Sequence, residues 1–128
     1  MEFVYEVKAS GDFNEVVDKV KESIAKNNFG VLWEMNIKDK LGEKGVNFER
    51  NFAIMEVCNP KKAKEVLEKN IMVGYFLPCK IVVYEKDESI YIGMLKPTNL
   101  MEMVGEDSLR NIAVEVESTL KKAIDDVK

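Results

Sequence analysis

Apolar residues recur at helical spacing in two segments, one near each end of the chain, and this pattern constrains the fold more than any other. The first segment covers residues 12–28 and carries a stripe made of Phe13, Val16, Val17, Val20 and Ile24. Asp12 precedes Glu15 by three residues, which resembles a capping box at the helix start. The second segment carries a longer stripe, made of Leu109, Ile112, Ala113, Val116, Leu120, Ala123 and Val127. Each predicted helix therefore needs an apolar surface on which to bury one stripe.

Shorter segments with the pattern of β-strands can supply that surface. We predict strands at residues 3–8, 31–37, 51–58, 79–85 and 90–95. The third is apolar on both faces, as expected of a central strand, and the turn KDES joins the last two in a predicted hairpin. Asn59 is a favoured N-cap residue and Pro60 a favoured first helical residue, so a short helix follows the third strand. Residues 38–49, with one helical turn around Leu41, and residues 96–107 are predicted as connections.

The element order β-α-β-β-(short α)-β-β-α indicates an α+β fold in a single domain, residues 1–128. The economical arrangement is an antiparallel or mixed sheet of about five strands with the two long helices on one face. The other face would then be open, and Leu32 and Val82 are predicted to point there. Such a face indicates a dimer interface or a groove, although scattered surface hydrophobic residues are an equal alternative.

The composition excludes several classes of function. The chain has no histidine, which removes Ser-His-Asp and Cys-His catalysis and the usual zinc-hydrolase sites. Its net charge of −4 argues against binding to nucleic acid. We find neither an apolar run long enough to span a membrane nor a signal peptide, so we expect a cytoplasmic protein without a membrane partner. No catalytic constellation is recognisable, and we expect neither an enzyme nor a cofactor.

The two cysteines lie in VCNPKKAKEVL and in FLPCKIVVYE. If the third and fourth strands are antiparallel neighbours, Cys58 would oppose Cys79 with a Cα separation of roughly 4.5–5.5 Å, which a disulfide tolerates. Cys58 also directly precedes the N-cap Asn59, and Lys61 and Lys62 follow. The helix dipole and these lysines would lower the pKa of a thiol there, or would hold an anionic ligand.

Three interpretations of the cysteines stay open. They can be small buried residues, a thiol site for redox or metal chemistry, or part of a ligand site. Two thiolates fall short of the usual four zinc ligands, unless a dimer assembles four or methionines complete a copper(I) site. In the second strand Val31, Trp33 and Met35 are predicted to share one face, and Leu32, Glu34 and Asn36 the other. The candidate ligand-binding residues are Cys58, Asn59, Lys61, Lys62, Cys79, Glu34 and Asn36.

Four motifs together resemble a known family of small bacterial and archaeal proteins, catalogued as domain of unknown function number three hundred and two. They are FGVLWEMNIKDKLGEKG, CNPKKA, LPCKIVVYE and a late KP followed by methionines. The resemblance implies a TATA-binding-protein-like α+β fold, with a curved antiparallel sheet and a long C-terminal helix, and it implies homodimers. The resemblance does not imply any particular activity. The family often has Asp at the positions of Asn36 and Lys96, so a site that used those acids would be altered here.

On these grounds we expect a homodimeric binding domain for a small ligand or a protein partner, with its site near the Cys-Asn-Pro helix start. The alternatives are a thiol-based redox or metal-binding protein that uses Cys58 and Cys79, and a purely structural oligomerisation module. The first alternative requires reactive thiols. The second requires a large apolar interface and no pocket.

Overall fold

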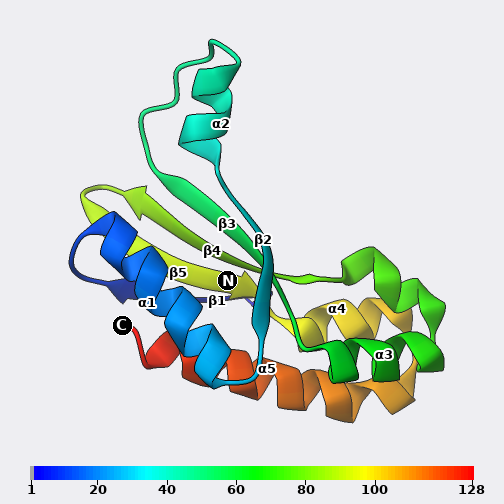
Figure 1. The fold of residues 1–128 in the computed structure, drawn as a ribbon. Coiled ribbons are helices and arrows are strands. Elements are labelled where there is room, and N and C mark those ends of the chain that lie inside the picture. Colours follow the sequence, from blue (N-terminus) through cyan, green and yellow to red (C-terminus); the bar gives the residue numbers. More distant parts are fainter. Residues whose placement is uncertain (1) are drawn as a thin grey trace.

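A five-stranded antiparallel sheet forms the centre of the computed structural model, which describes residues 2–128 (Figure 1). The strands are β1 (Val4–Ala9), β2 (Gly30–Asn36), β3 (Phe52–Cys58), β4 (Cys79–Lys86) and β5 (Ser89–Leu95). Their spatial order is β1-β5-β4-β3-β2, and each neighbouring pair is antiparallel. The predicted α+β class is confirmed, and of the two predicted kinds of sheet the antiparallel one is present.

In Figure 1 one helix lies in front of the sheet and the longest runs below it, two more lie at the lower right, and a short one projects at the top. They are α1 (Phe13–Lys26), α2 (Ile37–Glu43), α3 (Pro60–Lys69), α4 (Pro97–Val104) and α5 (Arg110–Asp125), with two 3₁₀ helices, η1 (Ile71–Phe76) and η2 (Asp107–Leu109). Within residues 2–128, no helix combines the length and the apolar character needed to cross a bilayer.

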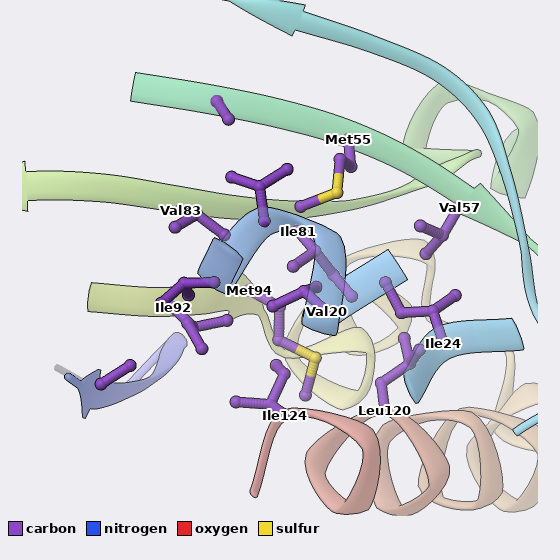
Figure 2. Packing of buried hydrophobic residues seen from close by; sticks show 14 of the residues in the cluster. Val20, Ile24, Met55, Val57, Ile81, Val83, Ile92, Met94, Leu120 and Ile124 are labelled. Atoms are coloured by element: carbon purple, nitrogen blue, oxygen red, sulfur yellow. The ribbon is translucent and has the colours of Figure 1, made fainter. Parts of the chain in front are cut away.

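The two long helices, α1 and α5, bury their stripes against the same face of the sheet, as the sequence predicts (Figure 2). Ile24 of α1 and Leu120 of α5 meet Ile81 of β4 in one core. The core side chains that are 0% exposed come from both helices and from the three central strands, and they include Ile24, Met55, Ile81, Ile92, Leu120 and Ile124. Full burial of side chains of this size stabilises a fold by about 1.5–3 kcal/mol each. The shared core therefore fixes both helices on the sheet.

The opposite face of the sheet carries partly exposed apolar and aromatic side chains. Val82 pairs with Ile54 and Gly93 there, so its predicted direction is confirmed. The rings of Phe52 and Tyr84 stack with centroids 5.2 Å apart. Tyr84 and Tyr91 stack at 5.4 Å on the same face.

A bulge in β2 changes the predicted directions of its side chains. The register shifts between Val31 and Trp33, so that Val31 pairs with Val57 while Trp33 pairs with Glu56. Val31 therefore lies on the core face and Trp33 on the opposite one, and the prediction that they share a face is wrong. The extra residue of a bulge reverses the alternation beyond it. Leu32 lies at this bulge and is 61% exposed.

Two segments predicted as connections form helices. Asn36 caps α2 by accepting a hydrogen bond from the N–H of Lys38 at 3.0 Å, so the helix begins directly after β2. The predicted single turn around Leu41 is therefore part of a longer helix. The segment after β5 forms α4, with Pro97 in its first turn.

The start of α4 is capped from α5, because Lys96 at its N-cap position makes no capping hydrogen bond with its side chain. Glu117 Oε1 accepts hydrogen bonds from the N–H of Thr98 at 3.1 Å and from its hydroxyl at 2.7 Å. Glu117 Oε2 also pairs with Lys121 at 3.3 Å. Burial by itself raises the pKa of Glu117, but the hydrogen bonds from Thr98 and the charge of Lys121 outweigh it, and the pKa lies below its ordinary value.

We predict that Glu117→Ala destabilises the protein by about 1–2 kcal/mol at neutral pH, because Thr98 loses its partner. Because the pKa of Glu117 is lower in the folded than in the unfolded state, its carboxylate stabilises the fold above the unfolded-state pKa of about 4.3. This stabilisation is lost as pH falls through the folded-state pKa. The difference between wild type and variant should therefore shrink in acid. Urea unfolding across pH measures it, with Ser118→Ala at the exposed neighbour as the control. A difference that stays constant with pH would contradict the role assigned to this carboxylate.

Candidate functional site

A small second core lies beside the main one, beyond the ends of β3 and β4. Val66 of α3, Val73 of η1, and Leu109 and Ile112 beside them are its buried members. Between the two cores is a pocket of about 50 Å³. Its wall is formed by side chains and backbone of Phe29, Val57, Cys58, Asn59, Lys62, Ala63, Val66, Val73, Leu77, Cys79, Pro97, Met101, Ile112, Ala113 and Val116. Most of these residues are apolar, so the pocket suits an apolar group.

The pocket brings together four of the residues predicted from sequence, Cys58, Asn59, Lys62 and Cys79. The other three predicted residues lie elsewhere. Lys61 is exposed, and its backbone N–H donates to Asn59. Glu34 forms an ion pair with Lys21 of α1. Asn36 caps α2 and donates to Asn51 Oδ1 at 3.0 Å.

The two cysteines are not opposed, which corrects the predicted register. Cys79 pairs with Val57, and Cys58 pairs with Gly30 of β2. The pairing is offset by one residue, so the two cysteines are not opposed in the ladder, and both line the pocket. Both cysteines are free. They approach the pocket from the last residue of β3 and the first residue of β4.

The thiols are less acidic than ordinary cysteines. Burial, with a smaller contribution from the charge of Cys58, raises the pKa of Cys79 to about 11. Burial also raises the pKa of Cys58. The expectation of a lowered pKa at this helix start is therefore wrong, because burial removes hydration that the thiolate needs. Both thiols are protonated at neutral pH.

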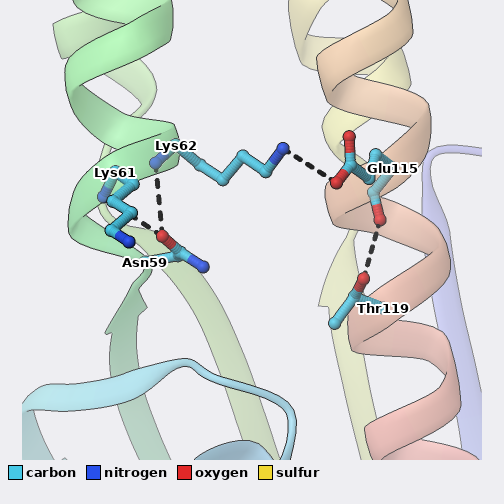
Figure 3. Close-up of polar contacts among 5 residues, drawn as sticks. All are labelled: Asn59, Lys61, Lys62, Glu115 and Thr119. Atoms are coloured by element: carbon cyan, nitrogen blue, oxygen red, sulfur yellow. Dashed lines mark hydrogen bonds and ion pairs between the residues drawn. The ribbon is translucent and has the colours of Figure 1, made fainter.

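The start of α3 is already saturated with hydrogen bonds. Asn59 Oδ1 accepts from the N–H groups of Lys61 at 3.1 Å and Lys62 at 3.2 Å (Figure 3). The carbonyl of Asn59 accepts from the N–H of Ala63 at 2.9 Å. Pro60 has no N–H. The first turn of α3 therefore keeps no backbone donor for an anionic ligand, in contrast to the usual anion site at a helix start.

Lys62 crosses from α3 to α5, where its Nζ lies 2.8 Å from Glu115 Oε1 (Figure 3). The hydrogen bond that Lys62 donates to Glu115 is the main reason that the pKa of Lys62 is raised. The Lys62 side chain is 29% exposed, while that of Glu115 is 60% exposed. The pair therefore lies at the rim of the pocket, with the carboxylate on the solvent side.

Sequence reasoning missed the walls of the pocket that come from α4 and α5. Met101 lies in a segment predicted as a connection, and Ile112 and Ala113 were recognised only as part of the helical stripe. The apolar stripe of α5 is regular, so its spacing does not indicate that Ile112 belongs to a second core. Across residues 2–128, no three or more His, Cys, Asp or Glu side chains are grouped so that they could hold a metal ion.

Comparisons with known proteins place the chain in a family. The model of the family described as "Domain of unknown function DUF302" matches residues 5–127. The crystal structure of an uncharacterised conserved DUF302 protein from Bacillus stearothermophilus is similar over 100% of both chains, with 42% identity and a TM-score of 0.95. A search of curated proteins gave no significant match. The chain therefore belongs to the DUF302 family.

Proposed function

We propose that this protein is a binding module for a small ligand that places an apolar group in the pocket between the two cores. The observation that carries the proposal is the pocket itself, which has an apolar wall and lies where Cys58, Asn59, Lys62 and Cys79 meet. Pockets of this kind, with few polar groups at the rim, are the usual form of small-ligand sites. The module is a cytoplasmic one in this proposal.

The size of the pocket limits what can enter. A volume of about 50 Å³ corresponds to about three or four water-sized spheres, on the scale of about 10–15 Å³ for each. Pockets for drug-sized ligands measure roughly 300–1,000 Å³. A short aliphatic end therefore fits, and the remainder of a larger ligand has to lie outside.

The rival function, a thiol redox site, has less support. A reactive cysteine needs thiolate character, whereas the raised pKa values of Cys58 and Cys79 keep both thiols protonated. Cys79 pairs with Val57 and both cysteines are free, which gives no support to a disulfide between them. In our proposal the cysteines are part of the pocket wall and do not react.

We further propose that the module is a homodimer, and that the open face of the sheet meets a second copy. Val82 and the stacked rings of Phe52, Tyr84 and Tyr91 would form the centre of the interface. Around them the face carries charges of both signs, from Glu6, Lys8, Glu56 and Lys80. Because these charges balance, a second copy of the same face meets no net repulsion. An apolar centre within a polar rim is the usual composition of a protein interface.

We predict that xenon, a neutral apolar probe, enters the pocket of the native protein. Amide chemical shifts measured under xenon pressure should change in a saturable way at Val57, Ala63 and Met101. Ala63→Leu should abolish these changes, because the larger side chain fills the space. Ala25→Leu, at an exposed position of α1, is the matched control and should leave them intact. If wild-type protein shows no saturable change at the pocket, the binding proposal fails.

We predict that neither thiol alkylates rapidly in the native protein at pH 7, because the reactive thiolate is scarce when the pKa is raised. The rate at Cys79 should rise only as pH approaches about 11. Timed alkylation with mass spectrometry, repeated on unfolded protein, measures both thiols. Fast native modification below pH 7 would instead support the redox alternative.

We predict that Val82→Glu weakens self-association by about a hundredfold or more, since it places an unpaired charge at the centre of the proposed interface. Sedimentation equilibrium measures the mass of each variant, with circular dichroism to verify folding. Val114→Glu introduces the same charge at a 50% exposed position of α5 and should leave the dimer intact. A wild-type protein that is monomeric at micromolar concentration would refute the dimer.

A further inference from the structure

A second, polar hollow adjoins the apolar pocket. Its volume is about 310 Å³, and it lies between the end of α1, the start of α3 and the middle of α5. The two spaces share part of their walls, namely Phe29, Asn59, Lys62 and Val116. Asn59 and Lys62 are the polar members of that shared wall. A ligand could therefore place an apolar end in the first space and a polar head in the second.

The charges around the hollow favour an anionic head. Lys26 and Lys62 are cationic, and Glu115 is the one acid in its wall among the residues described. The carbonyl end of α1 and the amide end of α3 also lie beside the hollow. The first carries a partial negative charge and the second a partial positive charge, so the two offset one another. The N–H groups of Asn27 and Phe29 donate hydrogen bonds to the carbonyl of Ile24, which further reduces the partial negative charge at the end of α1. The lysines are therefore the charges that decide what binds.

Glu115 occupies the position that an anionic head would take. Its carboxylate lies 2.8 Å from Nζ of Lys62 (Figure 3), and Lys62 lines both spaces. Because the Glu115 side chain is 60% exposed, it can turn into water without losing much hydration. Lys62 is more covered, at 29% exposed, and keeps its position beside the pocket. Exchange of one carboxylate for another then leaves the charge on Lys62 compensated.

We infer that the ligand is a carboxylate with a short aliphatic end, whose head replaces Glu115 on Lys62 while its aliphatic end fills the apolar pocket. The inference rests on the proposed ligand binding and adds the chemical class of the ligand. The backbone at the start of α3 cannot provide the anion site, because the N–H groups of Lys61 and Lys62 already donate to Asn59 Oδ1. Lys62 is therefore the residue that determines specificity.

Butyrate and butyramide are matched probes, because they share a three-carbon end and a similar shape but differ in charge. Amide chemical-shift titrations of the native protein give both affinities. Butyrate should bind about threefold to tenfold more tightly than butyramide, the range expected of one charge-assisted contact at a partly exposed site. Glu115→Gln removes the competing carboxylate, so it should tighten butyrate binding by a similar factor and leave butyramide unchanged. Lys62→Gln should make the two affinities equal.

Lys61→Gln is the control, since it removes the neighbouring charge of α3 at an exposed position outside both spaces. It should preserve the preference for butyrate. Equal binding of the two probes by wild type, or a Glu115→Gln variant with unchanged butyrate affinity, would overturn the inference. If xenon fills the pocket but neither probe binds, the ligand class is wrong and the binding proposal stands. If xenon is also excluded, both fail together.

Discussion

Burial of one face of the sheet under two helices is the interaction on which the rest of this structure depends. Side chains of the central strands, such as Met55, Ile81 and Ile92, are completely buried beneath Ile24 of α1 and other helical residues. Because α1 and α5 need the same face, they lie side by side across it. Their positions determine where the remaining helices can pack, since α3 and α4 have to find apolar partners beyond the strand ends.

The pocket follows from this arrangement of two cores. The larger core is centred on the sheet, and the smaller one joins α3, η1, η2 and α5 around Val66, Val73, Leu109 and Ile112. α5 contributes to both cores, while their other side chains come from different elements, and where the cores meet the packing leaves about 50 Å³ unfilled. Unfilled volume in a protein interior usually costs stability. Its occurrence beside an ion pair at the rim supports a binding role over a purely structural one.

Polar interactions around the pocket divide into those that hold the fold and those that a ligand could replace. Asn59 saturates the start of α3, and Glu117 saturates the start of α4. Loss of either side chain would leave backbone N–H donors without partners, which lowers the stability of the fold when those donors are shielded from water. The ion pair between Lys62 and Glu115 is different, because both groups can be rehydrated. This pair is therefore the adjustable contact of the site.

The sequence by itself determined the secondary structure that depends on local pattern. The stripes of α1 and α5, the strands, the hairpin between β4 and β5, and the Asn59 cap all follow from residue spacing within a few turns. It also placed Cys58, Asn59 and Lys62 near one another, because they are close together in the chain.

Tertiary structure decided the rest. The third strand is apolar on both faces and so gives no period-two preference. Only its pairing set the register, in which Cys79 pairs with Val57 and not with Cys58. The cap of α4 comes from Glu117, 19 residues beyond Thr98, and the far wall of the pocket comes from α4 and α5. Such contacts join residues distant in sequence, so no local pattern can encode them.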